Sequence, residues 1–279
     1  MITVNLFSPT FANETGSTMG KSARHIQYAH NEKHWNGITF FTDGLVNDGI
    51  VDRVDSRYKI GWLREPQCLY PQVYAQSLSN IDKFSTILTY HADLLAHDGY
   101  TFAPYGGVWI KRADWGLRPK SKIVSMLYGT KMATEGHILR HTIANLLGDK
   151  HGIDYYGYRG TPTDYGADTK RRVLKEYAFS IVIEACNQEN LFTEILLDCF
   201  AVGTIPIFWG CPNIGHFFDA RGIIAFTAPE QLLTIVPHLS HSMYQYLLPY
   251  AKNNLAAVEQ YEIAEDWIFQ HVLKGKFCD

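Results

Sequence analysis

Residues 177–210, YAFSIVIEACNQENLFTEILLDCFAVGTIPIFWG, decide the expected fold of this chain. The apolar run Phe179–Ile183 is typical of a strand covered on both faces. Thr193 and Glu194 then open a segment with helical apolar spacing, and Ile205–Trp209 forms a second buried strand. We therefore expect a βαβ unit whose loop lies at the carboxyl ends of parallel strands, where open α/β sheets bind ligands. The helix N-terminus in that loop favours an anionic ligand such as a nucleotide diphosphate.

Alternating strands and helices continue along the whole chain, which predicts an α/β protein with parallel sheets. Strands are expected at Ile2–Phe7, Gly37–Thr42, Lys59–Leu63, Phe84–Thr89, Lys122–Leu127, Ile153–Tyr156, Phe179–Ile183 and Ile205–Trp209. Helices are expected at about Glu135–Leu147, Thr193–Val202 and Pro229–Leu239, and from Ser242 to about Val272. The charged segment 111–120 contains Gly116 and Pro119, so we divide the chain into domains 1–116 and 117–279.

Composition describes a well-cored protein, because 46% of the 279 residues are hydrophobic and 19% are charged. A net charge of −3 offers no general attraction to nucleic acid or anionic lipid. The longest uncharged run, residues 199–215, contains Gly203, Pro206 and Pro212, so we expect core strand and turn there and no stable membrane insertion. The first residues do not have the pattern of a signal peptide. Five cysteines without a C-x-x-C pair predict reduced thiols, a cytoplasmic location and no zinc site.

Three segments in the same order resemble the α1,3-fucosyltransferases of glycosyltransferase family 10. Residues 177–210 resemble their donor-binding core through the order strand, Glu, polar loop, Thr-Glu, helix and Gly-Thr-x-Pro-x-x-x-Gly. The other two segments are Thr89-Tyr90 with Asp93 and Pro104-Tyr105-Gly106, and Lys122-Ile123-Val124-Ser125 with Arg140 and Tyr156-Gly157. The resemblance covers roughly residues 60 to 220. It implies two Rossmann-like domains facing across a cleft, the GT-B type.

The resemblance also implies an activity. An enzyme of this kind transfers fucose from GDP-fucose to a glycan hydroxyl with inversion, and it requires no metal or other cofactor. The first domain then serves the acceptor and the second binds the nucleotide-sugar donor. No D-x-D motif is present, since Asp52 and Asp55 have the wrong spacing.

An inverting transfer needs a carboxylate that removes the acceptor proton. The resemblance implies Glu65 for this role, just after the strand Lys59–Leu63 and before Pro66. A solvated turn glutamate, or one paired with Arg64, explains the same residue structurally. Asp93 is the second candidate.

The departing diphosphate needs positive charge, and the ribose needs an acceptor for its hydroxyl protons. The resemblance implies Arg140 for the diphosphate, because a guanidinium grips two phosphate oxygens. It implies Glu194 for the ribose, and it places Glu184 and Thr193 among the donor-binding residues, with Thr193 also expected to cap the helix. A surface arginine paired with a carboxylate, and an acid favoured by the helix dipole, are the structural alternatives.

Three positions depart from the family pattern. Ile195 stands where the family has lysine, Ala185 follows Glu184 in place of asparagine, and Leu191 replaces an aromatic residue. Lys131 is the nearest residue that can supply the missing charge. Two other functions therefore stay open: a GT-B transferase that uses a different nucleotide sugar, and an inactive protein that binds glycans or nucleotides.

Two further patterns invite other functions. Residues 16–22, GSTMGKS, look like a phosphate-binding P-loop, but only three residues separate the glycines where the motif needs four. A loop with a helix N-cap is the expected alternative. His137 and His141 have a metal-ligand spacing on one helix, but no glutamate or third ligand accompanies them. Ordinary helix-surface or cleft histidines are the interpretation we favour.

Overall fold

The structure is a computed structural model that describes residues 1–11, 15–149, 151–158 and 161–278. It contains two units, and each combines separate parts of the chain. Unit 1 consists of Met1–Gly107, Glu189–Leu191 and Ile263–Asp279, and unit 2 consists of Val108–Gln188 and Phe192–Glu262. The chain thus passes into unit 2 after Gly107, ahead of the expected boundary at Gly116, and its C-terminal segment belongs to unit 1.

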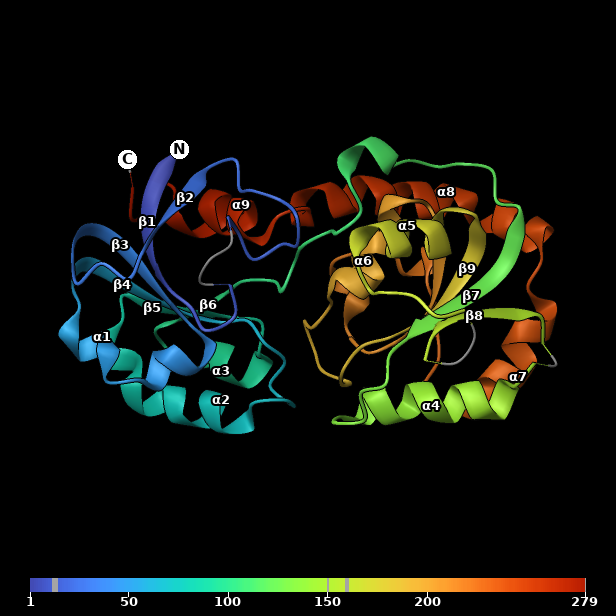
Figure 1. Cartoon of the computed structure of the whole chain (residues 1–279), viewed down its shortest axis with the longest axis horizontal. Helices are drawn as coiled ribbons and strands as arrows, with labels where there is room; N and C mark the ends of the chain where they lie inside the picture. The colour runs from blue at the N-terminus through green and yellow to red at the C-terminus, as the bar shows by residue number, and fades with distance from the viewer. Residues whose placement is uncertain (12–14, 150, 159–160, 279) are drawn as a thin grey trace. The chain divides into compact units, whose positions relative to one another are not determined.

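Unit 1 is built on a parallel sheet with the spatial order β2-β1-β3-β4-β5-β6. Its strands are β1 (Ile2–Phe7), β2 (Ile26–His30), β3 (His34–Thr42), β4 (Asp55–Leu63), β5 (Thr86–Thr89) and β6 (Tyr100–Phe102). One face carries α1 (Ile50–Arg53), α2 (Pro71–Ser77) and α3 (Ala92–Leu95), and the other carries α9 (Ala264–Ile268), as Figure 1 shows. The parallel sheet with helices on both faces confirms the expected α/β class for this unit.

The C-terminal segment joins unit 1 through apolar packing. The long helix expected from Ser242 to about Val272 is divided: α8 (His241–Ala257) ends well before α9, and Ile263 between them has an extended backbone. Ile263 and Ile268 are 5% and 0% exposed, in the same apolar cluster as residues of β1, β3 and β4. Burial of these side chains against the sheet of unit 1 accounts for the break in the helix.

Unit 2 is built on a parallel sheet with the order β11-β10-β9-β7-β8. Its strands are β7 (Lys122–Tyr128), β8 (Ile153–Gly157), β9 (Tyr177–Ile183), β10 (Ile205–Trp209) and β11 (Ile224–Ala225). Its helices are α4 (Glu135–Leu147), α5 (Ala167–Lys175), α6 (Glu194–Ala201), α7 (Leu232–Ile235) and α8. In Figure 1, α4 covers one face of this sheet, and α5 and α6 cover the other. Every residue of β9 is buried, as its apolar run predicts for a central strand.

Strand order also locates the place where each sheet favours a ligand. In unit 2 the connection from β7 runs through α4 to β8 on one side, whereas β9 lies on the other side of β7. In unit 1 the strand order reverses in the same way at β1, which lies between β2 and β3. Loops diverge at such a reversal and leave a crevice at the carboxyl ends of the strands.

Candidate functional site

A buried carboxylate organises the carboxyl end of β9. Glu184 follows the last residue of β9 and is 1% exposed. Its Oε1 accepts a hydrogen bond from the Thr193 amide and its Oε2 accepts one from the Thr193 hydroxyl, each at 2.8 Å. Burial raises the pKa of Glu184 to about 7, although these bonds oppose the rise. Glu184 thus ties the end of β9 to the start of α6 and holds the loop between them.

The first turn of α4 lies directly against the same strand end. The Gly136 amide donates to the Ala185 carbonyl at 3.0 Å. A Cβ atom on Gly136 would lie 1.8 Å from the Glu184 carbonyl oxygen, so only glycine permits this approach. Helices α4 and α6 therefore both begin near the end of β9. The partial positive charges at their N-termini make this edge of the sheet suitable for an anion.

Arg140, on α4, directs its guanidinium to the end of β9. Its Nε donates to the Ile183 carbonyl at 3.0 Å, and its Nη2 donates to the same oxygen. Burial lowers the pKa of Arg140, and the negative charges of Glu184 and Glu194 oppose that effect. The side chain is therefore neither a surface arginine nor one half of a simple ion pair. The Ile183 carbonyl holds the guanidinium plane in one orientation.

The start of α6 matches the expected cap. The Thr193 hydroxyl accepts a bond from the Ile195 amide at 3.4 Å while it donates to Glu184, so Thr193 is the N-cap and has no hydroxyl proton left for a ligand. Glu194, the first residue of α6, has a side chain that is 13% exposed, and Ile195 beside it is half-buried. Of this group, Glu194 is the residue that can offer lone pairs to a ligand.

Glu194 belongs to a cluster of charged side chains that was not predicted from the sequence. Lys170, on α5, places its Nζ atom 2.9 Å from Glu194 Oε1 and 3.3 Å from Asp198 Oδ2. The same ammonium lies 3.9 Å from the centre of the Trp109 ring. The segment 170–175, KRRVLK, looks like a solvated charged face, but Val173 lies three residues after Lys170 on the buried side of the helix. That helical spacing is the signal that could have found the buried lysine.

The last donor-side candidate, Lys131, and two positions that depart from the family pattern differ in exposure. Lys131 is exposed in the loop between β7 and α4. Leu191 is fully buried and Ala185 is half-buried, so neither presents a polar side chain at this edge. These positions cannot supply the hydrogen bonds that the family pattern has there.

The histidine pair on α4 is placed among aromatic rings and charges. His137 is 6% exposed, and burial, Arg140 and Lys131 lower its pKa to about 4. His141 packs edge-on against Tyr128, at 5.3 Å between ring centres. Within residues 1–11, 15–149, 151–158 and 161–278, no three His, Cys, Asp or Glu side chains gather to hold a metal ion.

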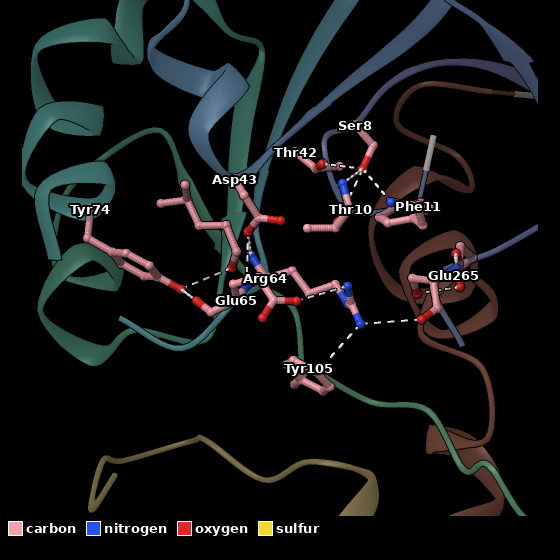
Figure 2. A network of polar contacts seen from close by, with 12 residues as sticks. Ser8, Thr10, Phe11, Thr42, Asp43, Arg64, Glu65, Tyr74, Tyr105 and Glu265 are labelled. Atoms are coloured by element: carbon pink, nitrogen blue, oxygen red, sulfur yellow. Dashed lines mark hydrogen bonds and ion pairs between the residues drawn. The ribbon is translucent and has the colours of Figure 1, made fainter. Parts of the chain in front are cut away.

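Glu65 lies in unit 1, two residues after the end of β4, and its side chain is 22% exposed. Figure 2 shows its carboxylate beside the guanidinium of Arg64, whose Nη1 donates to Glu65 Oε1 at 3.2 Å. Arg64 is held in turn by Tyr105, with the guanidinium carbon 4.7 Å from the ring centre and Nη2 donating to the hydroxyl at 3.2 Å. The neighbouring arginine considered in the sequence is therefore a fixed partner of this carboxylate.

The backbone of Glu65 is fixed from both sides by residues that sequence analysis did not select. Asp43 Oδ1 accepts the amides of Arg64 and Glu65, at 2.9 Å and 2.8 Å. The Tyr74 hydroxyl donates to the Glu65 carbonyl at 2.6 Å. Figure 2 shows both contacts. Asp43 directly follows β3, which is the signal that could have identified it.

The structure also locates the other residues of unit 1 that the sequence singled out. The Ser17 hydroxyl, in the P-loop-like segment 16–22, donates to buried Glu265 at 3.0 Å. This segment leads into β2 and not into a helix, so neither a P-loop nor the expected helix N-cap is formed there. Asp93 lies in the first turn of α3 and is exposed.

None of the helices in the described parts of the chain has both the length and the apolar character needed to cross a bilayer.

Part of this chain matches a family model and segments of two known proteins. The family model described as "Glycosyltransferase family 10 (fucosyltransferase) C-term" matches residues 117–279. The alpha-(1,3)-fucosyltransferase FucT of Helicobacter pylori is 28% identical over 60 residues, which are 22% of this chain and 13% of that protein. A putative fucosyltransferase-like protein of Arabidopsis thaliana is 37% identical over 68 residues, 24% of this chain and 13% of that protein. The matched segments are thus a small part of either relative.

Solved structures share the fold. The crystal structure of an α1,3-fucosyltransferase matches with a TM-score of 0.56 and 14% identity, over 85% of this chain and 81% of that chain. An α1,3-fucosyltransferase crystal structure with GDP matches with a TM-score of 0.52 and 14% identity, over 89% of this chain and 78% of that chain. With the two parallel sheets, these likenesses confirm the expected α/β fold of the GT-B type.

Proposed function

The chain belongs to glycosyltransferase family 10, and from that premise we propose that it transfers fucose from GDP-fucose to a glycan hydroxyl, with inversion and without a metal. The observation that carries this proposal is the gathering of Arg140, Glu194 and two helix N-termini around the end of β9. A guanidinium and helix N-termini favour a diphosphate, and a carboxylate accepts the hydroxyl protons of a ribose. The crystal structure of an α1,3-fucosyltransferase with GDP supports GDP as the first nucleotide to test.

Arg140 is proposed to stabilise the departing diphosphate. Its Nε and Nη2 are used by the Ile183 carbonyl, while Nη1 has no hydrogen-bond partner among the described residues. A guanidinium fixed in this way loses little conformational freedom when a phosphate oxygen binds to Nη1. Lys131, on the exposed loop before α4, is proposed to supply a second positive charge in place of the lysine absent at position 195.

Glu194 is proposed to bind the ribose of the donor. An ionised carboxylate offers about four lone-pair positions, and Lys170 donates a hydrogen bond to Oε1 of Glu194. Glu184 and Thr193 are assigned supporting roles, since each spends its hydrogen-bonding groups on the other. Their part is to hold the first turn of α6, and therefore Glu194, in place.

Glu65 is proposed as the general base. As the acceptor oxygen forms a bond to the anomeric carbon of fucose, its proton passes to the Glu65 carboxylate. The bond from the anomeric carbon to the phosphate oxygen breaks on the opposite face, and GDP leaves with that electron pair. Asp43 and Tyr74 fix the backbone of Glu65, and Arg64 fixes its carboxylate. Such positioning is what proton transfer requires.

One observation favours a second candidate. Ala185, Leu191 and Ile195 provide no charge or hydrogen-bonding side chain where the family pattern has them. A transferase that uses another nucleotide sugar, or a protein that binds nucleotides without catalysis, fits this loss.

A nucleotide screen tests the proposal. Melting temperatures of the whole chain are measured with GDP, UDP, ADP and CMP, each with and without EDTA. A ligand at 100 times its dissociation constant is expected to stabilise by about 2.7 kcal/mol. We expect GDP to give the largest shift and R140Q to reduce it. R221Q, which alters an exposed arginine paired with Asp219, should keep the wild-type shift.

The outcomes separate the candidates. A shift with UDP but not GDP would favour the second donor class, and loss of the shift in EDTA would contradict metal independence. Nucleotide sugars that shift the melting temperature are then incubated with a panel of glycans, and products are detected by mass. Binding of nucleotides without consumption of any sugar donor would favour the inactive binding protein. No shift with any nucleotide would overturn the proposal for unit 2.

A further inference from the structure

Lys170 is the most deeply buried lysine among the described residues of unit 2, and the proposed reaction does not use it. Its side chain is 5% exposed, and it lies between the carboxylates of Glu194 and Asp198, which are 13% and 0% exposed. The Trp109 ring covers the ammonium at 3.9 Å. Lysine is almost never buried to this degree without partners, so these contacts define its position.

The cluster is also anchored to the backbone. Asp198 Oδ1 accepts the amides of Trp109 and Ile110, at 2.9 Å and 3.0 Å. Burial alone would lower the pKa of Lys170, but Glu194 and Asp198 outweigh it and raise that pKa, so the lysine stays charged. A series of contacts therefore links the backbone at residues 109–110 to Asp198, Asp198 to Lys170, and Lys170 to Glu194. Within this series Glu194 is the member with the most exposure, at the start of α6.

The position of Lys170 bears on the substitution at position 195. A lysine there would bring a positive charge to the first turn of α6, but the chain has a half-buried isoleucine. Lys170 provides a positive charge to Glu194 from α5 instead. Its burial leaves no path to a phosphate, so its effect on a ligand must pass through Glu194.

We propose that Lys170 is a positioning residue that holds the Glu194 carboxylate in the orientation that accepts the ribose hydroxyls, and so makes the site selective for ribonucleotides. This inference rests on the proposed function, because it takes Glu194 as the ribose partner. Lys170 makes no contact with the ligand. It acts by removing the rotational freedom of Glu194 and by neutralising its charge.

The test compares GDP with 2′,3′-dideoxy-GDP by calorimetry on the whole chain. A hydrogen bond to a charged group gives a preference for GDP of about tenfold to a hundredfold in the wild type. E194Q should lower that preference directly. Because removal of Lys170 alone leaves two buried carboxylates uncompensated, the main variant is K170M/D198N, and D198N is its reference.

We expect K170M/D198N to bind GDP at least about fivefold more weakly than D198N, while dideoxy-GDP binds the two within about twofold. If loss of Lys170 only destabilised the unit, GDP and dideoxy-GDP would bind equally more weakly, or the melting temperature would fall while the preference for GDP stayed unchanged. K122M removes a half-exposed lysine paired with Asp154 in the same unit and should keep the wild-type preference. Should K170M/D198N fail to fold, K170L/D198N, which is likewise apolar and has no hydrogen-bond donor, replaces it, and an unchanged preference there overturns the proposal.

The failures are distinguishable. If E194Q loses the preference and the Lys170 variants keep it, Lys170 does not position Glu194, while the ribose assignment stands. If E194Q itself keeps the preference, the role of Glu194 and that of Lys170 both fall. A wild type that binds neither nucleotide overturns the proposed function and this inference together.

Discussion

The Glu184 carboxylate receives both hydrogen-bond donors of Thr193, the amide and the hydroxyl, at 2.8 Å each. The hydroxyl of Thr193 in turn accepts the Ile195 amide, so one side chain caps α6 and satisfies a buried acid at the end of β9. Because Glu194 follows Thr193 directly, the geometry of the proposed donor site depends on this pair.

Substitution of Thr193 by valine therefore has two costs. It removes the helix cap, and it leaves a buried carboxylate with one donor fewer, so we expect T193V to lower the free energy of unfolding by about 1–3 kcal/mol. Urea denaturation measures the change. S240A removes the Ser240 cap of α8, which has no buried acid behind it, and should cost less than T193V. T193S keeps both bonds, so a loss in T193S as large as in T193V would contradict the explanation.

Glu184 should also make stability depend on pH. Its pKa is raised by burial from 4.5 to about 7 in the folded chain, so between these values the folded state holds a proton that the unfolded state has released. The free energy of unfolding should accordingly fall as pH rises from 4.5 through 7, by up to about 3 kcal/mol from this group. E184Q cannot titrate there, and urea denaturation at pH 5 and pH 8 should show a smaller fall in E184Q than in the wild type. Parallel pH dependence in the two proteins would contradict the buried-acid assignment.

The region around Thr193 was predictable from sequence because its local signals agree. The apolar run, the Thr-Glu pair and Gly203 predicted β9, α6 and β10 to within two residues. Strands β2 and β6 were missed because Ile26 is the one buried residue of β2, and all of β6 is half-buried, so neither has an alternating pattern. Such edge strands depend on pairing with neighbours that a local pattern does not contain.

Features that depend on contacts between distant parts of the chain could not be predicted from local patterns, for the same reason. Nothing in the tail separates α8 from α9, because the break serves the burial of Ile263 against strands more than two hundred residues earlier. The spacing to Val173 could have marked Lys170 as a buried position of α5, but its partners Glu194 and Asp198 come from a distant part of the sequence. The residues expected at the ends of β9 and α6 were identified by their order, while their buried partners required the tertiary contacts.

Lys131 is expected to contribute to diphosphate binding through charge alone. The side chain is exposed, so K131A should leave the melting temperature of the free protein unchanged and weaken GDP binding about threefold to tenfold by calorimetry. The effect should shrink in high salt. K252A removes an exposed lysine of α8 and is the matched control.

Ile195→Lys should not tighten GDP binding, because the position is half-buried at a helix N-terminus, where a cation is disfavoured by the dipole. A tighter complex in I195K would mean that the family lysine was simply lost. If neither K131A nor I195K changes the affinity for GDP, Lys131 does not replace the charge of the missing lysine.

Glu65→Gln tests the base. Glutamine keeps the size of the side chain and can still accept a bond from Arg64 Nη1, now 3.2 Å from Glu65 Oε1, but it cannot take the acceptor proton. General-base catalysis contributes typically 10²–10⁴-fold, so turnover should fall by about that factor. GDP affinity should stay within about twofold, since Glu65 belongs to unit 1 and the proposed diphosphate contacts belong to unit 2. D93N, which changes an exposed acid of the same unit, should keep wild-type turnover.

If D93N loses turnover and E65Q keeps it, the base is Asp93. If E65Q abolishes GDP binding instead, the donor and acceptor roles of the two units are reversed.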